Sequence, residues 1–331
     1  MRRTGKAFLL ILPVALCLFS TGCERHAKSE TYYLIGNNLG VPYWKTAAAG
    51  FNRAAALYGV TPRVDGPSNY DPQAELQALT NAVAAKPAGI LISIADPVLL
   101  GPQMDAAIGA GIPVITLDSD APGIHRLFFI GTNNLEAGRL GGQRAVEKLG
   151  DKGNVVFFSM PGQPNLDERL KGYQDIFSTH PGIKVVDVVN IKGDSGNAFD
   201  RAQQFLSLTG PAKIDAFICL ESSSAKDVAA VLERQHATDR LLIGMDVDQD
   251  TLNLIKTGAI EATVAQKPYT MGYYGLKALD EVHHYPPKAL QVDFDSNSFS
   301  PFPVFVDTGT ALVDKSNVDL YIRSAAEAQS K

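Results

Sequence analysis

Short apolar runs alternate with longer amphipathic runs from residue 32 almost to the end of the chain. Tyr32–Gly36 has the pattern of a buried strand. Tyr43–Tyr58 has the pattern of a helix, because Trp44, Phe51 and Tyr58 fall on one apolar stripe. This strand and this helix form the first cycle of a repeating alternation.

The same alternation predicts the remaining elements. Further strands are expected at Thr61–Asp65, Gly89–Ile94, Pro113–Leu117, Leu127–Ile130, Asn154–Phe158, Ile183–Val189, Ala216–Leu220, Leu241–Met245 and Ala262–Ala265. Further helices are expected to begin at Asp71-Pro72 and Asp96-Pro97 and to cover Asn134–Leu149, Leu166–Thr179, Ala198–Leu208, Ser223–Arg234, Asp248–Lys256 and Met271–Val282. Strands that are apolar throughout and alternate with helices indicate an α/β fold with parallel sheets covered on both faces. One such sheet cannot hold this many strands in a chain of 331 residues, so we expect two sheets.

Polar and aromatic residues follow the predicted strands, at the carboxyl ends where open α/β sheets bind ligands. The candidate ligand-binding residues are Asn38, Tyr43, Trp44, Asp118, Ser119, Arg169, Ser195, Glu221, Asp246 and Gln266. Carboxylates and amides suit the hydroxyl groups of a sugar, an arginine donates two parallel hydrogen bonds, and an aromatic plane suits the C–H face of a sugar ring. The set therefore predicts a polyhydroxylated ligand.

Each of these residues also has a purely structural interpretation. Asp and Asn at strand ends commonly cap the following helix. Tyr43 and Trp44 fit the apolar stripe of a core helix, and Arg169 could form a surface ion pair with Asp167 or Glu168. The binding hypothesis rests on so many polar groups occurring at the same relative place.

The N-terminus has the pattern of an export signal. Arg2, Arg3 and Lys6 precede an apolar run over Ala7–Phe19, which is too short to span a bilayer. Residues 1–22 are therefore expected to be a signal peptide and residues 23–31 a polar tether. Ser20-Thr21-Gly22-Cys23 resembles a bacterial lipobox, with Ser20 in place of the usual Leu, so we expect lipidation at Cys23. Ordinary cleavage without a lipid is the alternative.

Composition narrows the function further. The net charge is −5, and an exported acidic chain has no electrostatic basis for binding nucleic acid. The three cysteines are Cys17, Cys23 and Cys219. If the first two are used in export, no intramolecular disulfide or cysteine metal cage can form, and Cys219 is expected to be a buried thiol.

No catalytic, cofactor or metal motif is apparent. The sequence contains no Gly-x-Ser-x-Gly elbow and no phosphate-binding glycine-rich loop after a strand. The histidines from 26 to 236 lack metal-ligand spacing, and His283-His284 is interpreted as a solvated helix end. Residues 246–250 resemble part of a calcium loop, but Thr251 and Thr257 occupy its glycine and glutamate positions. We therefore expect no enzyme activity, no cofactor and no metal site.

Three motifs together support a resemblance to a known family. They are Pro42-Tyr43-Trp44, the run Gly111-Ile112-Pro113-Val114-Ile115-Thr116-Leu117-Asp118, and Thr263-Val264-Ala265-Gln266. From about Tyr32 to about Leu320 the chain resembles the ribose-binding type of periplasmic solute-binding protein, which shares its core fold with the lactose repressor. The resemblance implies a type I periplasmic binding protein fold, with two Rossmann-like lobes and parallel sheets joined by a three-strand hinge. It implies crossings near 132–134, near 266–267 and around 307–310. The expected N-terminal lobe is 32–132 plus 267–307, and the expected C-terminal lobe is 133–266 plus 308–331.

The resemblance also implies roles for individual residues. Tyr43 and Trp44 correspond to paired aromatics that stack on the sugar, and Asp118 to a carboxylate that accepts from two hydroxyls. Arg169 corresponds to a donor to the sugar, and Asp246 and Gln266 to the second-lobe acid and the hinge amide. The chain departs from the ribose type in three places. Ser119 replaces an arginine, Glu221 or Ser222 replaces an asparagine, and Phe199 is the nearest candidate for a second stacking aromatic near Ser195.

The implied function is that of a receptor for an ABC importer, which binds a monosaccharide or polyol and delivers it to an inner-membrane permease. Such a receptor would be a monomer in the periplasm or at the cell surface, held at the membrane only through its lipid, or soluble in the periplasm if it is not lipidated. Two alternatives share the fold: a ligand receptor for chemotaxis or a sensor kinase, and a sugar-responsive transcriptional regulator. The regulator would need a DNA-binding head before the first strand, where this chain has a signal peptide.

Overall fold

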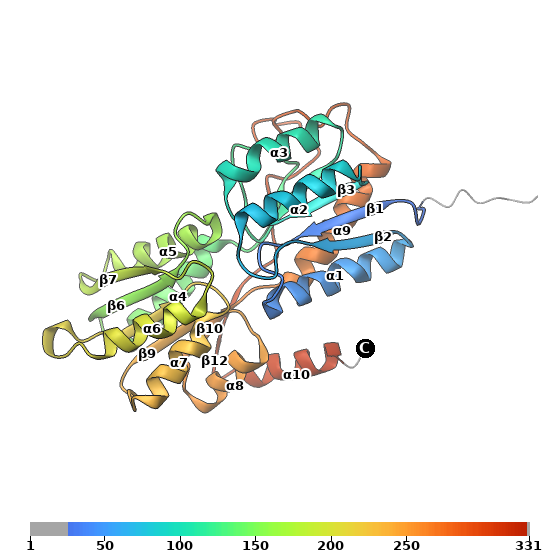
Figure 1. Ribbon diagram of the computed structural model, residues 1–331. Coiled ribbons are helices and arrows are strands. Elements are labelled where there is room, and N and C mark those ends of the chain that lie inside the picture. The colour runs from blue at the N-terminus through green and yellow to red at the C-terminus, as the bar shows by residue number, and fades with distance from the viewer. Residues whose placement is uncertain (1–25, 330–331) are drawn as a thin grey trace, which may run out of the picture.

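The computed structural model describes residues 26–329 and contains two α/β lobes, each built on one six-stranded sheet (Figure 1). The predicted signal peptide and Cys23 lie outside the described residues. None of the helices within 26–329 combines the length and the hydropathy needed to cross a bilayer. The α/β architecture with two sheets that the apolar pattern predicts is confirmed.

The N-terminal lobe contains the first five strands and receives two later elements. Its elements in chain order are β1 (Thr31–Ile35), α1 (Pro42–Tyr58), β2 (Thr61–Asp65), α2 (Pro72–Ala84), β3 (Gly89–Ile92), α3 (Pro97–Gly109), β4 (Val114–Leu117), β5 (Phe129–Gly131), α9 (Pro268–His284) and β11 (Phe305–Asp307). The strand order is β11-β5-β4-β3-β1-β2, and all pairs are parallel.

The C-terminal lobe repeats this plan. Its elements are α4 (Asn134–Leu149), β6 (Lys152–Ser159), α5 (Pro164–Phe177), β7 (Gly182–Asn190), α6 (Ser195–Leu206), the short 3₁₀ helix η1 (Gly210–Ala212), β8 (Ala216–Cys219), α7 (Ser224–Arg234), β9 (Leu241–Met245), α8 (Gln249–Thr257), β10 (Ala262–Ala265), β12 (Ala311–Asp314) and α10 (Val318–Gln329). The strand order β12-β10-β9-β8-β6-β7 matches that of the first sheet. The edge strand β12 differs from the expected all-parallel sheet, because it runs antiparallel to β10.

Each sheet is covered on both faces by apolar side chains. In the N-terminal lobe, α1 and α9 contribute Phe51 and Leu276 to one core, and α2 and α3 contribute Leu79 and Met104 to the other. In the C-terminal lobe, the core beneath α6, α7 and α8 is separate from the core beneath α4 and α5. Cys219 is 1% exposed within the first of these, as expected for a buried thiol, and burial raises the pKa of that thiol.

Several helices begin earlier than the apolar pattern predicts, at a proline. The structure starts α1 at Pro42, α5 at Pro164 and α9 at Pro268. Proline fits the first helical turn because the backbone N–H that it lacks would have no partner there. These prolines place the first turns of three helices directly after strands β1, β6 and β10.

One helix pair in each lobe is packed closely through glycines. A Cβ atom at Gly138 of α4 would lie 2.0 Å from the carbonyl oxygen of Arg169, and one at Gly172 of α5 would lie 2.2 Å from that of Leu135. Gly50 of α1 approaches the carbonyl oxygen of Tyr269 of α9 in the same way, with 2.0 Å for the added Cβ. Larger side chains would separate these helices, so the glycines fix where α5 and the start of α9 lie.

The chain passes between the two sheets three times, at 132–133, 266–267 and 308–310. Threonine hydroxyls connect each crossing to residues at or next to another crossing. Thr132 Oγ1 donates to Gln266 Oε1 at 2.9 Å, Thr308 Oγ1 to the Gly131 carbonyl at 2.9 Å, and Thr310 Oγ1 to the Ala265 carbonyl at 2.8 Å. The three crossings therefore form one hydrogen-bonded hinge.

Candidate functional site

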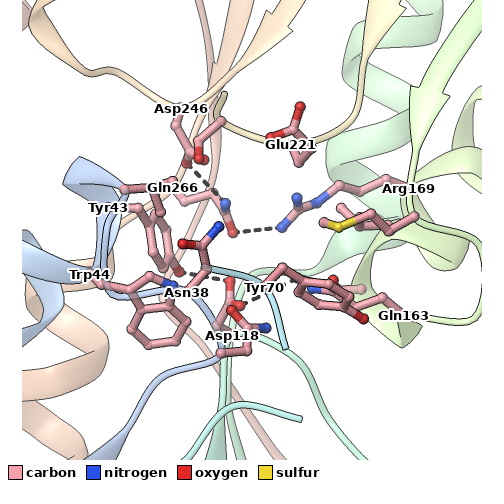
Figure 2. Close-up of a pocket in the computed structure, with 16 residues that line it drawn as sticks. Asn38, Tyr43, Trp44, Tyr70, Asp118, Gln163, Arg169, Glu221, Asp246 and Gln266 are labelled. Carbon is pink, nitrogen blue, oxygen red and sulfur yellow. Dashed lines mark hydrogen bonds between the residues drawn. The ribbon is translucent and has the colours of Figure 1, made fainter. Parts of the chain in front are cut away.

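A cavity of about 60 Å³ lies between the lobes, where the carboxyl ends of both sheets face each other (Figure 2). The N-terminal lobe lines it with Asn37, Asn38, Val41, Tyr43, Trp44, Tyr70 and Asp118, and the C-terminal lobe and hinge with Met160, Gln163, Asn165, Leu166, Arg169, Glu221, Ser222, Asp246 and Gln266. Eight of the ten residues predicted from strand ends are in this set: Asn38, Tyr43, Trp44, Asp118, Arg169, Glu221, Asp246 and Gln266.

Asp118 and Asp246 occupy equivalent places in the two lobes. Each follows a strand, β4 or β9, and each has a left-handed backbone, with φ of 62° and 71° respectively. Each also donates its backbone N–H to the neighbouring strand, Asp118 to Ile130 at 3.2 Å and Asp246 to Val264 at 2.9 Å. A left-handed conformation is costly for residues other than glycine and is found mostly where function requires it. Here it turns both carboxylates into the same cavity.

The Asp118 carboxylate collects hydrogen bonds from both lobes. Tyr43 Oη donates to Oδ1 at 2.8 Å, Ser93 Oγ to Oδ2 at 3.1 Å, and Asn165 Nδ2 of the opposite lobe to Oδ2 at 3.4 Å. Burial raises the pKa of Asp118, while the Arg169 charge and these donors oppose that rise. The bond from Asn165 joins the two lobes directly across the cavity.

Arg169 supplies the positive charge of the site. Its side chain emerges from α5 and is 2% exposed. Nε donates to Asn134 Oδ1 at 2.9 Å, Nη1 to the Leu220 carbonyl at 2.8 Å, and Nη2 to Gln266 Oε1 at 2.9 Å. Arg169 is therefore not the surface residue, paired with Asp167 or Glu168, that the structural interpretation predicted.

Gln266 connects Arg169 to the second acid and to the hinge. Its Oε1 accepts from Arg169 and from Thr132, and its Nε2 donates to Asp246 Oδ1 at 2.9 Å. These partners fix which end of the amide faces which neighbour. Burial raises the pKa of Asp246 to about 7, although the Arg169 charge and the bond from Gln266 oppose that rise. One carboxyl of the site therefore titrates near neutral pH.

The aromatic wall is formed by the first turn of α1. Tyr43 and Trp44 pack edge to face, with ring centroids 5.4 Å apart at an angle of 80°. Trp44 is 3% exposed and belongs to the lobe core as well as to the cavity lining, so the core interpretation holds for it and its ring also borders the cavity. Burial raises the pKa of the Tyr43 hydroxyl, which keeps it a donor to Asp118.

Glu221 lines the cavity but also caps a helix. Its carboxylate accepts from the backbone N–H groups of Ser223 at 2.6 Å and Ser224 at 2.9 Å, and from Ser223 Oγ at 2.5 Å. These bonds satisfy the first turn of α7. Most of the acceptor capacity of Glu221 is thus used within its own lobe.

Ser119 and Ser195 were predicted to contact the ligand, but neither lines the cavity. Ser119 is fully buried within the N-terminal lobe, because the left-handed turn at Asp118 directs the next residue away from the cavity. Ser195 is the first residue of α6, and the preceding Asp194 caps that helix. Phe199, the expected second aromatic, packs against the core of its own lobe with Arg234 over its ring.

Sequence reasoning missed several lining residues, chiefly Asn37, Tyr70, Gln163 and Asn165. Tyr70 directly precedes the cap of α2, in the connection after β2, where no candidate residue was predicted. Gln163 Nε2 donates to Asn165 Oδ1 at 2.9 Å, and Gln163 Oε1 is buried without a hydrogen-bond partner. That oxygen is an acceptor available to a ligand.

Metal binding is not indicated in this cavity. Among the described residues, three His, Cys, Asp or Glu side chains approach closely enough to share an ion only at His26, Asp280 and His284. None of these residues lines the cavity. The cavity offers instead carboxylate and amide acceptors, one guanidinium donor and an aromatic wall from two lobes.

Comparison with known proteins identifies the family to which this chain belongs. A family model described as a periplasmic binding protein domain matches residues 32–283. The ribose import binding protein of Escherichia coli (strain K12) is 25% identical over 280 residues, which is 83% of this chain and 92% of that protein.

Two solved structures extend the match. An arabinose binding protein from Geobacillus stearothermophilus is 32% identical with a TM-score of 0.71. A sugar-binding protein of a sugar ABC transporter from Bacillus halodurans is 34% identical with a TM-score of 0.75. Each alignment covers 88% of this chain and 99% of the other. With its two parallel-sheet lobes, its cavity between them and these matches, the chain belongs to the periplasmic binding protein domain family.

Proposed function

We propose that this chain is the solute-binding receptor of an ABC importer and that it binds a monosaccharide or similar polyol between its lobes. It would deliver that ligand to a permease in the inner membrane. Family membership supports this proposal, as do the sugar-binding relatives named above. The relatives are transport receptors rather than enzymes, and we propose no catalytic activity for this chain.

The observation that carries the proposal is the set of complementary polar groups that both lobes direct into one small cavity. Asp118 and Asp246 provide carboxyl acceptors from opposite lobes, and Arg169 provides a buried cationic donor. The first turn of α1 adds the flat face of Trp44. A ligand that bonds to both lobes favours their closed arrangement, because it binds that arrangement more tightly than an open one.

The departures from the ribose type bear on the ligand within this class. Ser119 stands where the ribose type has an arginine, so this chain lacks that cation next to Asp118. Tyr70 lines the cavity from the N-terminal lobe, and we infer that it serves as the second aromatic surface in place of Phe199. We therefore propose a monosaccharide or polyol other than ribose.

Export and anchoring form a separate part of the proposal. We propose that residues 1–22 are removed, that Cys23 carries a lipid, and that the receptor acts as a monomer at the periplasmic or cell-surface face of a membrane. The pattern of Arg2, Arg3, the apolar run Ala7–Phe19 and Gly22-Cys23 supports this. We also propose that the lobes divide as 32–132 plus 267–307 and 133–266 plus 308–331, at the hinge crossings.

Thermal-shift screening of the purified protein tests the ligand class. We expect at least one aldose, ketose or sugar alcohol to raise the melting temperature, and to raise it further at higher concentration, because a ligand that binds only the folded state stabilises it by mass action. Amino acids and short peptides should have no effect. If only these raise the melting temperature, the chain is not a sugar receptor.

Arg169→Ala should weaken binding of the ligand found in this screen. Loss of charge-assisted bonds in a desolvated cleft costs at least about 2 kcal/mol, or about 30-fold in Kd by titration calorimetry. Arg139→Ala is a matched control, because Arg139 lies on the adjacent helix α4, is about 40% exposed and pairs with Asp175 outside the cavity. Equal affinities of the two folded variants would place Arg169 outside the binding machinery.

The affinity should depend on pH through Asp246, whose pKa is raised to about 7. Ligand hydroxyls donate to the ionised carboxylate, so binding should tighten as pH rises through 7 and weaken by up to about tenfold per pH unit below it. Titrations from pH 5 to 9 measure this, and Asp246→Asn should remove the inflection near 7. An unchanged pH profile in that variant would assign the titration to another group.

Cys23→Ser should release the protein from the membrane. A chain with one or more acyl groups on Cys23 is retained by the bilayer, whereas the serine variant has no thiol to acylate. Detergent phase partitioning of both forms measures this, and mass spectrometry of the N-terminal peptide locates the modification. Wild-type protein that stays in the aqueous phase with an unmodified N-terminus would contradict the anchor.

A further inference from the structure

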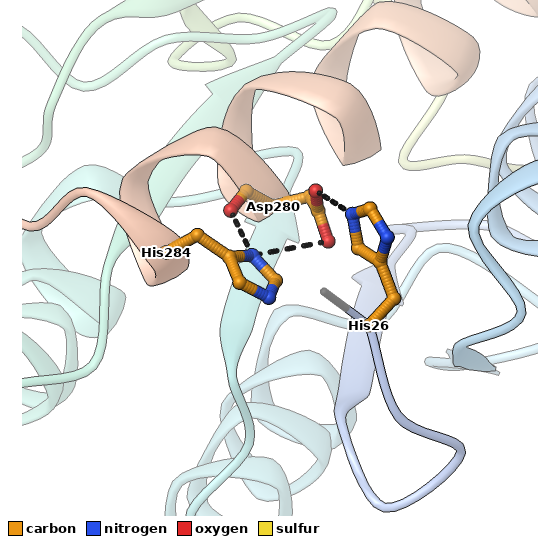
Figure 3. Close-up of side chains that lie close together, drawn as sticks. All are labelled: His26, Asp280 and His284. Carbon is orange, nitrogen blue, oxygen red and sulfur yellow. Dashed lines mark hydrogen bonds and ion pairs between the residues drawn. The ribbon is translucent and has the colours of Figure 1, made fainter. Parts of the chain in front are cut away.

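Three potential metal ligands meet on the N-terminal lobe, outside the cavity between the lobes (Figure 3). Asp280 and His284 lie one turn apart near the end of α9, and His26 reaches them from the segment before β1. His26 Nε2 is 2.9 Å from Asp280 Oδ2, and His284 Nδ1 is 3.6 Å from Asp280 Oδ1. One ligand atom from each residue lies within 4.8 Å of the other two.

These separations suit a shared ion. With bonds of about 2.0–2.1 Å to nitrogen and about 2.0–2.2 Å to oxygen, two ligands of a tetrahedral zinc ion stand about 3.3 Å apart. The observed 2.9 Å and 3.6 Å, which run to the two different oxygens of Asp280, lie on either side of that value. His284 Nδ1 is also 2.8 Å from the carbonyl oxygen of Asp280, so binding through this nitrogen would exchange that contact for a metal bond.

Neighbouring side chains hold the three groups in place. The His26 ring stacks on Tyr58, with centroids 4.7 Å apart and planes 6° from parallel. Tyr32 Oη donates to Asp280 Oδ1 at 3.2 Å. Contacts of this kind orient the ligands of metal sites in proteins and add to their affinity.

The charge of the cluster also favours a cation. Glu30 Oε2 is buried without a hydrogen-bond partner and lies 3.6 Å from His284 Nε2. Asp280 and Glu30 as carboxylates, with His26 and His284 neutral, carry two negative charges that one divalent ion would balance. Glu30 lies on the Nε2 side of the His284 ring, so with Nδ1 on the ion it would orient the ring rather than bind the ion.

We propose that His26, Asp280 and His284 form a site for a divalent transition-metal ion of the zinc type, with Glu30 against the other ring nitrogen of His284. Mixed imidazole and carboxylate donors suit zinc, whereas magnesium and calcium take oxygen ligands. The ion would join residues 254 positions apart in the chain. It would fasten the segment that leads into β1 to α9 and so fix the point where that segment leaves the lobe.

Titration of the metal-free protein with Zn²⁺ tests the proposal. The mature protein is purified without a polyhistidine tag, stripped with a chelator and followed by calorimetry and by its melting temperature. We expect one equivalent of Zn²⁺ to bind and to raise the melting temperature, with no such effect of Mg²⁺ or Ca²⁺. His26→Ala, Asp280→Asn and His284→Ala should each weaken Zn²⁺ binding at least tenfold.

His125→Ala is the matched control. His125 is paired with Asp105 at 2.8 Å, but both side chains are about 50% exposed and they form no three-ligand group. This variant should bind Zn²⁺ like the wild type. His26→Ala changes a residue that lies before the first strand, so it reports on the site even if Asp280→Asn fails to fold. Absence of saturable Zn²⁺ binding by the wild type, or equal losses in His26→Ala and His125→Ala, would overturn the proposal.

Discussion

The arrangement of the cleft depends on one buried charge, the guanidinium of Arg169. A cation that is 2% exposed is costly unless dipoles and opposite charges surround it. Three neutral oxygens, on Asn134, Leu220 and Gln266, accept its hydrogen bonds, and the carboxylates of Asp118 and Asp246 approach from opposite lobes. Because Gln266 also bonds to Thr132 and Asp246, the same charge organises the hinge and both halves of the cleft.

The two lobes use the same local solutions to place these groups. An aspartate with a left-handed backbone follows the strand that is third in the order of each sheet. This strand is β4 in one sheet and β9 in the other. In each lobe, one pair of helices next to the cleft packs closely through glycines. The pairs are α1 with α9 and α4 with α5. The close approach of α4 to the backbone of Arg169 means that the position of the buried cation depends on packing between helices as well as on its hydrogen bonds.

Much of this could be predicted from the sequence, because buried parallel strands are apolar throughout and their carboxyl ends gather at one edge. That rule identified Asp118, Asp246, Arg169 and Gln266. It also selected Ser119, which is buried outside the cavity lining directly after Asp118, whose left-handed backbone periodicity does not encode. It predicted neither β12 nor its antiparallel direction, since a four-residue edge strand gives little periodic signal.

Residues outside regular elements were harder to predict. Tyr70, Gln163 and Asn165 lie in connections or first helical turns, where the apolar pattern carries no information about which way a side chain points. The grouping of His26 with Asp280 and His284 depends on α9 returning to the N-terminal lobe after the chain has built the other lobe. Metal-ligand spacing along the sequence cannot detect ligands that only the topology brings together.

The three threonine-bonded crossings have a mechanical consequence. A single connection would let the two lobes rotate and twist freely relative to each other. Three hydrogen-bonded connections still permit a hinge bend but oppose twisting and sliding of one lobe against the other. We therefore expect the lobes to separate mainly by a hinge bend. A partner protein that contacts both lobes at once could then distinguish a filled cleft from an empty one by the angle between the lobes. It would need no contact with the bound ligand.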